Sequence, residues 1–349
     1  MEIHVQYIHR CLSLAARARG HTGINPMVGA VLVREGKIIA EAAHEQFGGL
    51  HAEALLFKKC IHNIKQEDGL YTNLEPCCHQ GKKTRPCTEA IIKSGIKRVI
   101  IGMVDPNPEV AGKGIAELRK NGIEVIGPIE RAHSEWLNRG FVSLMTKGRP
   151  WITLKKAQTR GGAIACDDGS KMKITSEEQN RWSHQFLRAK HDAILVGVGT
   201  VVTDDPKLTS RIENGKLKIE NYQPLRIVLD PDLRIPLSAK IVSGEMGKGT
   251  MVVTKDSEES DPSTPLRAGD PKDSNEKMRL LRDRGVRIIQ LPVDASGAFD
   301  LPALFRLLTT PTGDFYGVTS ILVEGGRKTW EAFRKAKAVD CEVTLLGKE

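Results

Sequence analysis

The chain has 349 residues, of which 40% are hydrophobic and 27% are charged, and its formal net charge is +9. A chain of this length exceeds what one ordinary hydrophobic core accommodates, so we expect two domains. The apolar content excludes a mostly disordered chain. No run approaches the roughly 18 uninterrupted apolar residues of a transmembrane helix, which excludes a membrane span. Residues 1–10 carry two histidines and a glutamate where a signal peptide needs an apolar core, which predicts a cytoplasmic protein.

The charge and the cysteines indicate the kinds of partner to expect. A net charge of +9 suits phosphorylated small molecules as well as nucleic acid, because both are anionic. Only 5% of the residues are aromatic, which argues weakly against a single-strand binder built on stacked rings. Of the seven cysteines, Cys77, Cys78 and Cys87 lie close together in the sequence, and a metal explains this clustering better than a disulfide framework does.

The first half of the sequence alternates helices with strands. The spacing of apolar residues predicts helices over 5–19, 53–60, 88–94 and 113–120. Residues 27–33 and 37–42 are predicted to form a hairpin that turns at 34–36, and further strands are expected over 70–74, 98–104 and 123–126. We therefore expect residues 1–147 to form a three-layer α/β domain with a mixed sheet.

Gly148-Arg149-Pro150 marks the predicted domain boundary, because the alternation of strands and helices starts again after it. Strands are expected over 151–157, 193–198, 225–229, 250–253, 286–291 and 320–323. Thr175 and Glu178 are predicted to form a capping box at the start of one helix, and Asp300 is the expected N-cap of another over 300–308. Residues 255–277, rich in Asp, Glu, Ser and Pro, are predicted to be a mobile surface insertion in a second domain of residues 150–349.

One group of residues has the spacing of a catalytic zinc site. His51 and Glu53 are separated by one residue, and Pro76-Cys77 is followed ten positions later by Cys87. A catalytic zinc takes three protein ligands and keeps a position for water, and one imidazole with two thiolates supplies those three. The metal lowers the pKa of that water toward neutrality, and Glu53 could take its proton and pass it to a leaving amine. His-x-Glu followed by Pro-Cys and a second cysteine is the signature of zinc nucleobase deaminases.

A structural zinc site is the alternative interpretation of these residues. It would use Cys77, Cys78, Cys87 and a histidine such as His79 as four closed ligands. Such a site gives Glu53 no role, so the catalytic interpretation is favoured.

Four runs of residues resemble the bifunctional deaminase/reductase family of riboflavin biosynthesis: Asn25–Gly29, His51–Glu53, Thr72–His79 and Asp105–Gly112. The resemblance implies a cytidine-deaminase-like first domain. This domain would hydrolyse the 2-amino group of a diaminopyrimidinone that carries a ribosylamino 5′-phosphate. The resemblance also assigns Zn²⁺ to His51, Cys77 and Cys87, and proton transfer to Glu53.

The same resemblance implies a set of residues that line the pyrimidine and ribose-phosphate site: Asn25, His44, His79 and Asp105. The spacing between the two cysteine ligands is one residue longer than is usual in the family. Lys82-Lys83 holds the extra residue, in what we expect to be a surface loop. The loop's positive charges could meet the substrate phosphate, but a solvated loop is slightly favoured.

Residues 150–349 resemble the reductase half of that family, which implies a dihydrofolate-reductase-like α/β fold and hydride transfer from NADPH. The matching segments are 187–189, 197–200, 203–206, 208–209 and 324–327. By resemblance, NADPH contacts Ala157, Thr200, Asp204 and Gly326, and the substrate contacts Arg188, Leu208, Arg211 and Glu324. Arginines suit phosphate because a guanidinium forms paired hydrogen bonds to its oxygens. A helix-surface salt bridge for Arg188 and a turn cap for Asp204 are equally weighted interpretations.

Three departures from the family pattern lead to the hypothesis that the reductase activity is impaired. Residues 159–162 read Thr-Arg-Gly-Gly and lack the family's aspartate, and Lys171-Met172-Lys173 replaces a motif that ends in tryptophan. The chain also ends shortly after Leu345-Leu346-Gly347, where the family continues with a further strand, so we expect a shortened second domain. In an alternative interpretation, Lys173 contacts NADPH and Lys171 contacts the substrate.

The sequence thus predicts zinc-dependent deamination followed by NADPH-dependent reduction of a phosphorylated pyrimidine. We expect a homo-oligomer that binds neither nucleic acid nor membrane. Two alternatives remain open: a deaminase acting on nucleic acid, which the positive charge permits, and a non-catalytic scaffold with bound zinc.

Overall fold

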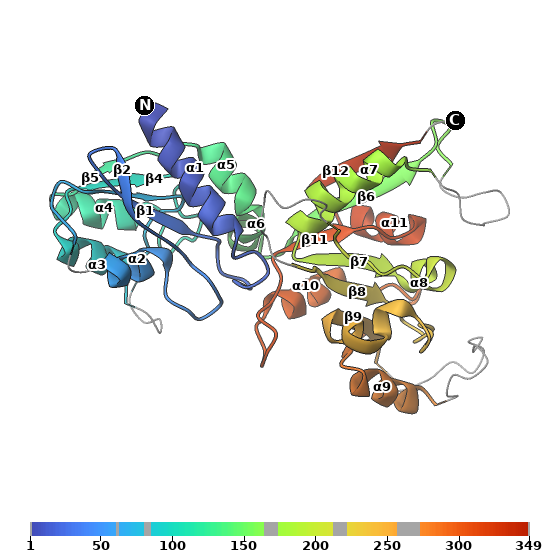
Figure 1. The fold of residues 1–349 in the computed structure, drawn as a ribbon. Helices are drawn as coiled ribbons and strands as arrows, with labels where there is room; N and C mark the ends of the chain where they lie inside the picture. Colours follow the sequence, from blue (N-terminus) through green and yellow to red (C-terminus); the bar gives the residue numbers. More distant parts are fainter. Residues whose placement is uncertain are drawn as a thin grey trace. The chain divides into compact units, whose positions relative to one another are not determined.

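The computed structural model describes residues 2–60, 63–79, 85–163, 174–211, 222–256 and 273–347 (Figure 1). The chain divides into two compact units. Unit 1 comprises Met1–Arg149 together with Thr309–Thr319, and unit 2 comprises Pro150–Leu308 together with Ser320–Glu349. No helix in the described ranges is both long and apolar enough to cross a membrane.

Unit 1 contains a mixed sheet of five strands in the order β2-β1-β3-β4-β5. The strands are β1 (Gly29–Arg34), β2 (Lys37–Ala43), β3 (Gly69–Thr72), β4 (Arg98–Ile101) and β5 (Glu124–Ile126). β1 runs antiparallel to both β2 and β3, whereas β3, β4 and β5 are parallel to one another. Glu35 and Gly36 both have positive φ, which is the backbone that a tight two-residue hairpin turn requires. The predicted hairpin and mixed sheet are therefore confirmed.

Helices cover both faces of this sheet and make the domain three-layered (Figure 1). α1 (Glu2–Ala16) buries Ile8 and Cys11 in one cluster with Val31 of the sheet. The opposite cluster includes Leu56 of α2, Ile91 of α3 and Leu118 of α4. The bounds of these three helices are Ala52–Cys60, Cys87–Ser94 and Lys113–Lys120. Two further helices, α5 (Arg131–Leu137) and α6 (Arg139–Lys147), were not predicted from the sequence.

Residues 309–319 belong to unit 1, although they lie within the sequence of the predicted second domain. Tyr316 explains their packing, because its carbonyl accepts a hydrogen bond from the Ile24 backbone N–H at 3.0 Å. Its ring stacks on Phe47, with ring centroids 5.0 Å apart and an interplanar angle of 18°. Gly23, at φ 56°, fits against the same residue, since a Cβ there would lie 2.3 Å from the Tyr316 carbonyl oxygen.

Replacing Tyr316 tests this attachment. Tyr316→Ala is expected to lower the free energy of unfolding of unit 1 by about 1 kcal/mol, because it removes an aromatic pair. Tyr316→Phe keeps the ring and should leave the stability unchanged. Chemical denaturation of both variants measures the difference, and equal losses in the two would contradict a role for the ring.

Unit 2 contains seven parallel strands in the order β10-β9-β8-β7-β11-β6-β12. They are β6 (Trp151–Gln158), β7 (Ala193–Gly197), β8 (Leu225–Leu229), β9 (Thr250–Lys255), β10 (Arg287–Leu291), β11 (Ser320–Val323) and β12 (Cys341–Leu346). The helices are α7 (Glu177–Trp182), α8 (Val198–Asp204), α9 (Ser274–Asp283), α10 (Leu301–Thr309) and α11 (Arg327–Lys335), with short 3₁₀ and π turns between them. The predicted α/β architecture of this half is confirmed.

Two local predictions in this unit were wrong. The capping box is formed by Ser176 and Gln179 rather than by Thr175 and Glu178, since the Ser176 side chain accepts the Gln179 backbone N–H. The Thr175 hydroxyl instead donates to the Asn180 side chain. The predicted insertion over 255–277 is too long, because β9 includes Lys255 and α9 begins at Ser274; residues 257–272 lie outside the described ranges.

Candidate functional site

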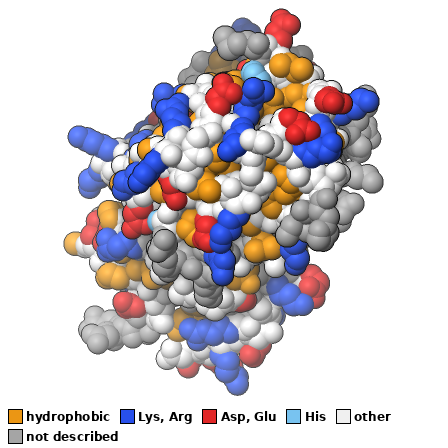
Figure 2. All heavy atoms as spheres, turned by 90° about the vertical axis from the view of Figure 1, so that its left-hand side faces the viewer, with side chains coloured by type: hydrophobic (Ala, Val, Ile, Leu, Met, Phe, Trp, Pro, Cys, Tyr) orange, Lys and Arg blue, Asp and Glu red, His pale blue; other side chains and the backbone are white. Residues whose placement is uncertain are grey.

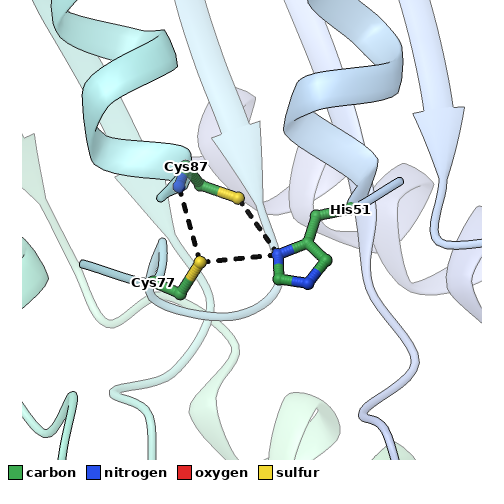
Figure 3. Close-up of side chains that lie close together, drawn as sticks. All are labelled: His51, Cys77 and Cys87. Atoms are coloured by element: carbon green, nitrogen blue, oxygen red, sulfur yellow. Dashed lines mark hydrogen bonds between the residues drawn. The ribbon is translucent and has the colours of Figure 1, made fainter. Parts of the chain in front are cut away.

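The predicted ligands His51, Cys77 and Cys87 come together in unit 1 (Figure 3). His51 directly precedes α2, Cys77 lies in the loop after β3, and Cys87 is the first residue of α3. The Nδ1 atom of His51 lies 3.3 Å from the Cys87 Sγ and 3.4 Å from the Cys77 Sγ. The backbone N–H of Cys87 also donates to the Cys77 sulfur at 3.4 Å.

The donor set fits a zinc ion. One ring nitrogen and two sulfurs lie within 4.8 Å of one another, and zinc favours these atoms in tetrahedral sites. The hydrogen bond from Cys87, together with His51, outweighs burial and lowers the pKa of Cys77 to about 4. The same pairing, with burial, raises the pKa of Cys87. One thiolate is thus already favoured, and zinc would displace the proton that the two sulfurs share.

Glu53 lies beside this group on the first turn of α2. The Cys87 thiol donates to its Oε2 atom at 3.4 Å, and the residue is only 3% exposed. Burial raises the pKa of Glu53 above its ordinary value. Among the described residues, the grouped ligand atoms include neither Cys78 nor His79. The geometry therefore favours three ligands with a neighbouring acid/base over a closed four-ligand site.

Asn25 and His44 extend the site on one side. The Asn25 side-chain amide lies 3.3 Å from the Nε2 atom of His44, whose Nδ1 atom lies 3.0 Å from the Leu50 carbonyl oxygen. The His44 ring is edge-to-face with the His51 ring at 5.7 Å, and burial lowers the pKa of His44. His44 is consequently a neutral hydrogen-bonding group at neutral pH.

Two buried asparagines, which the sequence analysis missed, hold the segment that follows Asn25. Asn138 accepts the Met27 backbone N–H, and Asn73 accepts the Gly29 backbone N–H, both at 2.8 Å. Both amide groups also donate to the Met27 carbonyl at 3.0 Å. Asn73 belongs to the run Thr72–His79, so its place in that run was the available signal. No local pattern marked Asn138, because its partner lies 111 residues away.

Glu75 is a second positioning residue that the sequence analysis gave no role. Its buried carboxylate accepts backbone N–H groups from Asp105 at 3.1 Å, Gly112 at 2.9 Å and Ile115 at 3.1 Å. It thereby ties the Cys77 loop to the segment that carries Asp105. Asp105 is 6% exposed. His79 lies two residues after Cys77, and its buried Nδ1 atom has no hydrogen-bond partner among the described residues.

Glu75→Gln should lower the free energy of unfolding of unit 1 by about 1–3 kcal/mol. The amide nitrogen of glutamine donates rather than accepts, so at least one buried N–H loses its partner. Glu109→Gln is the matched control, because Glu109 is exposed on the same segment. Denaturation midpoints compare the two variants, and equal midpoints would refute the positioning role.

In unit 2, the structure pairs two of the predicted reductase residues with each other. Arg188 donates to both carboxylate oxygens of Glu324, at 2.9 and 2.6 Å, and also to the Thr209 carbonyl at 3.1 Å. Burial favours the neutral form of Glu324, but the Arg188 charge and its hydrogen bonds outweigh burial and lower the pKa of Glu324 to about 2. Arg188 is therefore part of a buried ion pair and not of a surface salt bridge.

His184, which was not predicted, contacts Arg211 and interacts electrostatically with Arg188 and Glu324. The Arg211 backbone N–H donates to its Nδ1 atom at 3.2 Å, and the Arg211 guanidinium lies 2.9 Å from its Nε2 atom. Burial, followed by the charges of Arg188 and Arg211, lowers the pKa of His184 to about 4, so the ring is neutral at pH 7. Leu208 is buried nearby in sequence with φ 48°.

The remaining predicted reductase residues are distributed around the central strands. Thr200 and Asp204 lie on α8, which begins where β7 ends, and Gly326 is the N-cap of α11, just after β11. β7 and β11 are neighbouring parallel strands, so these residues lie at the carboxyl ends where ligands bind in such sheets. Ala157 lies on β6, opposite Leu345 of β12. Lys171 and Lys173 fall outside the described residues.

Family models and individual relatives agree on what the chain resembles. The cytidine and deoxycytidylate deaminase zinc-binding region matches residues 1–103, and the RibD C-terminal domain matches residues 150–346. The riboflavin biosynthesis protein RibD of Aquifex aeolicus is 41% identical over 347 residues, which are 99% of this chain and 87% of that protein. The chain belongs to the RibD family. RibD of Bacillus amyloliquefaciens is 36% identical over 96% of this chain and 81% of its own length.

Solved RibD structures have the same fold. RibD of Acinetobacter baumannii matches with a TM-score of 0.77 and 31% identity, over 100% of this chain and 87% of that one. A Thermotoga maritima diaminohydroxyphosphoribosylaminopyrimidine deaminase/5-amino-6-(5-phosphoribosylamino)uracil reductase matches with a TM-score of 0.74 and 31% identity, over 99% and 86% of the two chains. This RibD chain is accordingly a bifunctional enzyme of riboflavin biosynthesis, with a zinc-dependent deaminase domain and an NADPH-dependent reductase domain.

Proposed function

We propose that His51, Cys77 and Cys87 hold the zinc ion of the deaminase and that Glu53 moves the proton during hydrolysis. The substrate is 2,5-diamino-6-(5-phosphoribosylamino)pyrimidin-4(3H)-one, and the product is 5-amino-6-(5-phosphoribosylamino)uracil. The observation that carries the proposal is the grouping of one imidazole and two sulfurs with a buried carboxyl that bonds one of those sulfurs.

Each residue has a distinct task in this reaction. Zinc, when bound, supplies a water of lowered pKa. Glu53 would take a proton from that water and deliver it to the departing amino group, because it is a buried carboxyl that contacts one of the grouped sulfurs. Asn25 and His44, held beside His51 by their mutual contact, offer polar groups to the pyrimidine ring. His79 and Asp105 are assigned to the same substrate on the basis of the family's motif, the burial of Asp105 and the buried Nδ1 atom of His79.

The reductase half is proposed to bind its ligands at the carboxyl ends of β7 and β11. We assign Ala157, Thr200, Asp204 and Gly326 to NADPH, which supplies the hydride, and Arg188, Leu208, Arg211 and Glu324 to the substrate. Because the Arg188 guanidinium is already hydrogen-bonded to the Glu324 carboxylate, the exposed Arg211 is the better candidate to bind the substrate phosphate. Neutral His184 orients the Arg211 side chain. The proposed contacts of Lys171 and Lys173 remain predictions.

The surface charge on one face of the molecule gives no support to the nucleic-acid alternative. On the face that Figure 2 shows, Lys and Arg side chains are interspersed with acidic and uncharged ones instead of forming one continuous basic tract. A nucleic-acid strand is bound by such tracts with aromatic stacking. Self-association and a cytoplasmic location remain predictions, and light scattering of the purified protein measures the first.

Product analysis tests both halves together. The purified chain is incubated with the diaminopyrimidinone phosphate, with and without NADPH, and the products are identified by mass. We expect replacement of the amino group by oxygen in both samples, and a further gain of two hydrogens only with NADPH. Deamination without reduction would support the impaired-reductase hypothesis, and no deamination would overturn the proposal for unit 1.

A further inference from the structure

A second group of metal-ligating side chains lies in unit 1, apart from the deaminase ligands. Among the described residues, only two groups of three or more His, Cys, Asp or Glu side chains bring their ligand atoms within 4.8 Å of one another. One is the His51 group, and the other consists of His9, Glu130 and His133. His9 lies on α1, Glu130 immediately precedes α5, and His133 lies on the first turn of α5.

The three side chains converge on one carboxylate oxygen. The His9 Nε2 atom lies 3.1 Å from the Glu130 Oε2 atom, and the His133 Nδ1 atom bonds the same oxygen. The two imidazole rings meet edge-to-face, with centroids 5.5 Å apart at 82°. In Figure 1, α1 and α5 lie side by side, so the cluster bridges two helices that are far apart in the sequence.

The backbone under the cluster is fixed by buried neighbours. Ile8 and Ser134, which adjoin His9 and His133, are both fully buried. The histidine side chains themselves are 52% and 68% exposed, and that of Glu130 is 21% exposed. An ion could therefore enter from solvent and keep water in its remaining positions, while the helices hold the ligands in place.

We propose that His9, Glu130 and His133 form a second metal site, which takes a divalent transition-metal ion and joins α1 to α5. Two imidazoles and one carboxylate suit Zn²⁺, Ni²⁺ or Cu²⁺ better than Ca²⁺ or Mg²⁺, which prefer oxygen ligands. Glu130 and His133 are three residues apart, with Glu130 directly before α5 and His133 on the first turn of that helix. The site holds no sulfur, which distinguishes it spectroscopically from the His51 group.

Nickel titration of the tag-free full chain tests the site, after loading with only one zinc per chain so that the His51 group is filled and the second site is left open. We expect calorimetry to show one Ni²⁺ bound per chain, with no zinc released and no near-ultraviolet thiolate band. His133→Ala should weaken this binding at least tenfold and abolish the rise in melting temperature that nickel produces. Glu135→Gln is the control, because Glu135 lies on the same helix outside the cluster.

Three results would overturn the site. These are no nickel binding by the natural sequence, equal binding by His133→Ala and Glu135→Gln, or binding accompanied by zinc release and a thiolate band. The melting temperature of metal-free His133→Ala checks that the variant folds. His9→Ala, on the other helix, should reproduce the loss of binding and keeps the test valid if His133→Ala does not fold.

Discussion

Glu53→Gln is expected to lower kcat for deamination by a factor of about 10²–10⁴ and to leave one zinc per deaminase site in place. Glutamine has nearly the same shape as glutamate but cannot accept and release a proton. The proposed zinc ligands are His51, Cys77 and Cys87, so their donor atoms are unaffected. Product formation under saturating substrate and zinc content by mass spectrometry are measured on the same sample.

Glu45→Gln is the matched control for this prediction, because Glu45 is exposed and lies outside the grouped ligand atoms. Its activity should equal that of the natural sequence. Unchanged turnover in Glu53→Gln would favour the non-catalytic scaffold. Loss of zinc together with activity would show that Glu53 supports the metal site instead of carrying the proton.

Glu324→Gln is expected to lower the free energy of unfolding of unit 2 by about 3–5 kcal/mol. The substitution leaves the charged Arg188 guanidinium buried without a counter-charge, facing only neutral acceptors such as the Thr209 carbonyl. Replacing both partners, as Arg188→Met with Glu324→Leu, should recover much of this loss, because neither charge then remains buried. Chemical denaturation compares the single and double variants.

Acid should weaken the same pair. The pKa of Glu324 is about 2 in the folded chain and lies near 4.5 in an unfolded one. The folded state therefore binds the proton less readily, and the pair stabilises it fully above pH 4.5. This stabilisation, roughly 3 kcal/mol, is lost progressively as the pH falls from 4.5 toward 2. The double variant should lack this part of the acid dependence.

The exposed ion pair of Arg334 and Glu342 is a control for the buried pair of Arg188 and Glu324. Arg334 and Glu342 form the same two-fold contact, at 2.9 and 2.7 Å, but both side chains are 42% exposed. Glu342→Gln should change the stability by less than about 1 kcal/mol. A loss as large as that of Glu324→Gln would contradict the explanation by burial.

Much of the fold could be predicted where a pattern is local. The α3 helix ends at Gly95 in the left-handed conformation, and β8 and β11 have the bounds that their apolar runs indicate. α11 was not predicted because most of its residues are polar. Only Trp330 and Phe333 are buried, which is too few to give a clear helical pattern of apolar residues. The place of residues 309–319 in unit 1 could not be predicted, since it depends on the contact of Tyr316 with Phe47.

The grouping of His51, Cys77 and Cys87 could be predicted because the chemistry of a zinc site fixes the residue types and their spacing. The residues that hold the surrounding loops could not, because Glu75 and Asn138 act through backbone groups far away in the sequence. The pairing of Arg188 with Glu324 also depends on tertiary structure, as 136 residues separate them. His184 belongs to no sequence motif. Its role is visible only in the structure, where the charges of Arg188 and Arg211 lower its pKa.

X-ray absorption at the zinc edge directly tests whether His51, Cys77 and Cys87 hold the zinc ion of the deaminase. It is best measured on zinc-loaded His133→Ala, so that the proposed second site does not contribute to the signal. We expect two sulfur ligands at about 2.3 Å and nitrogen or oxygen ligands at about 2.0–2.2 Å. A shell of four sulfurs, or one without sulfur, would contradict a deaminase centre built on His51, Cys77 and Cys87.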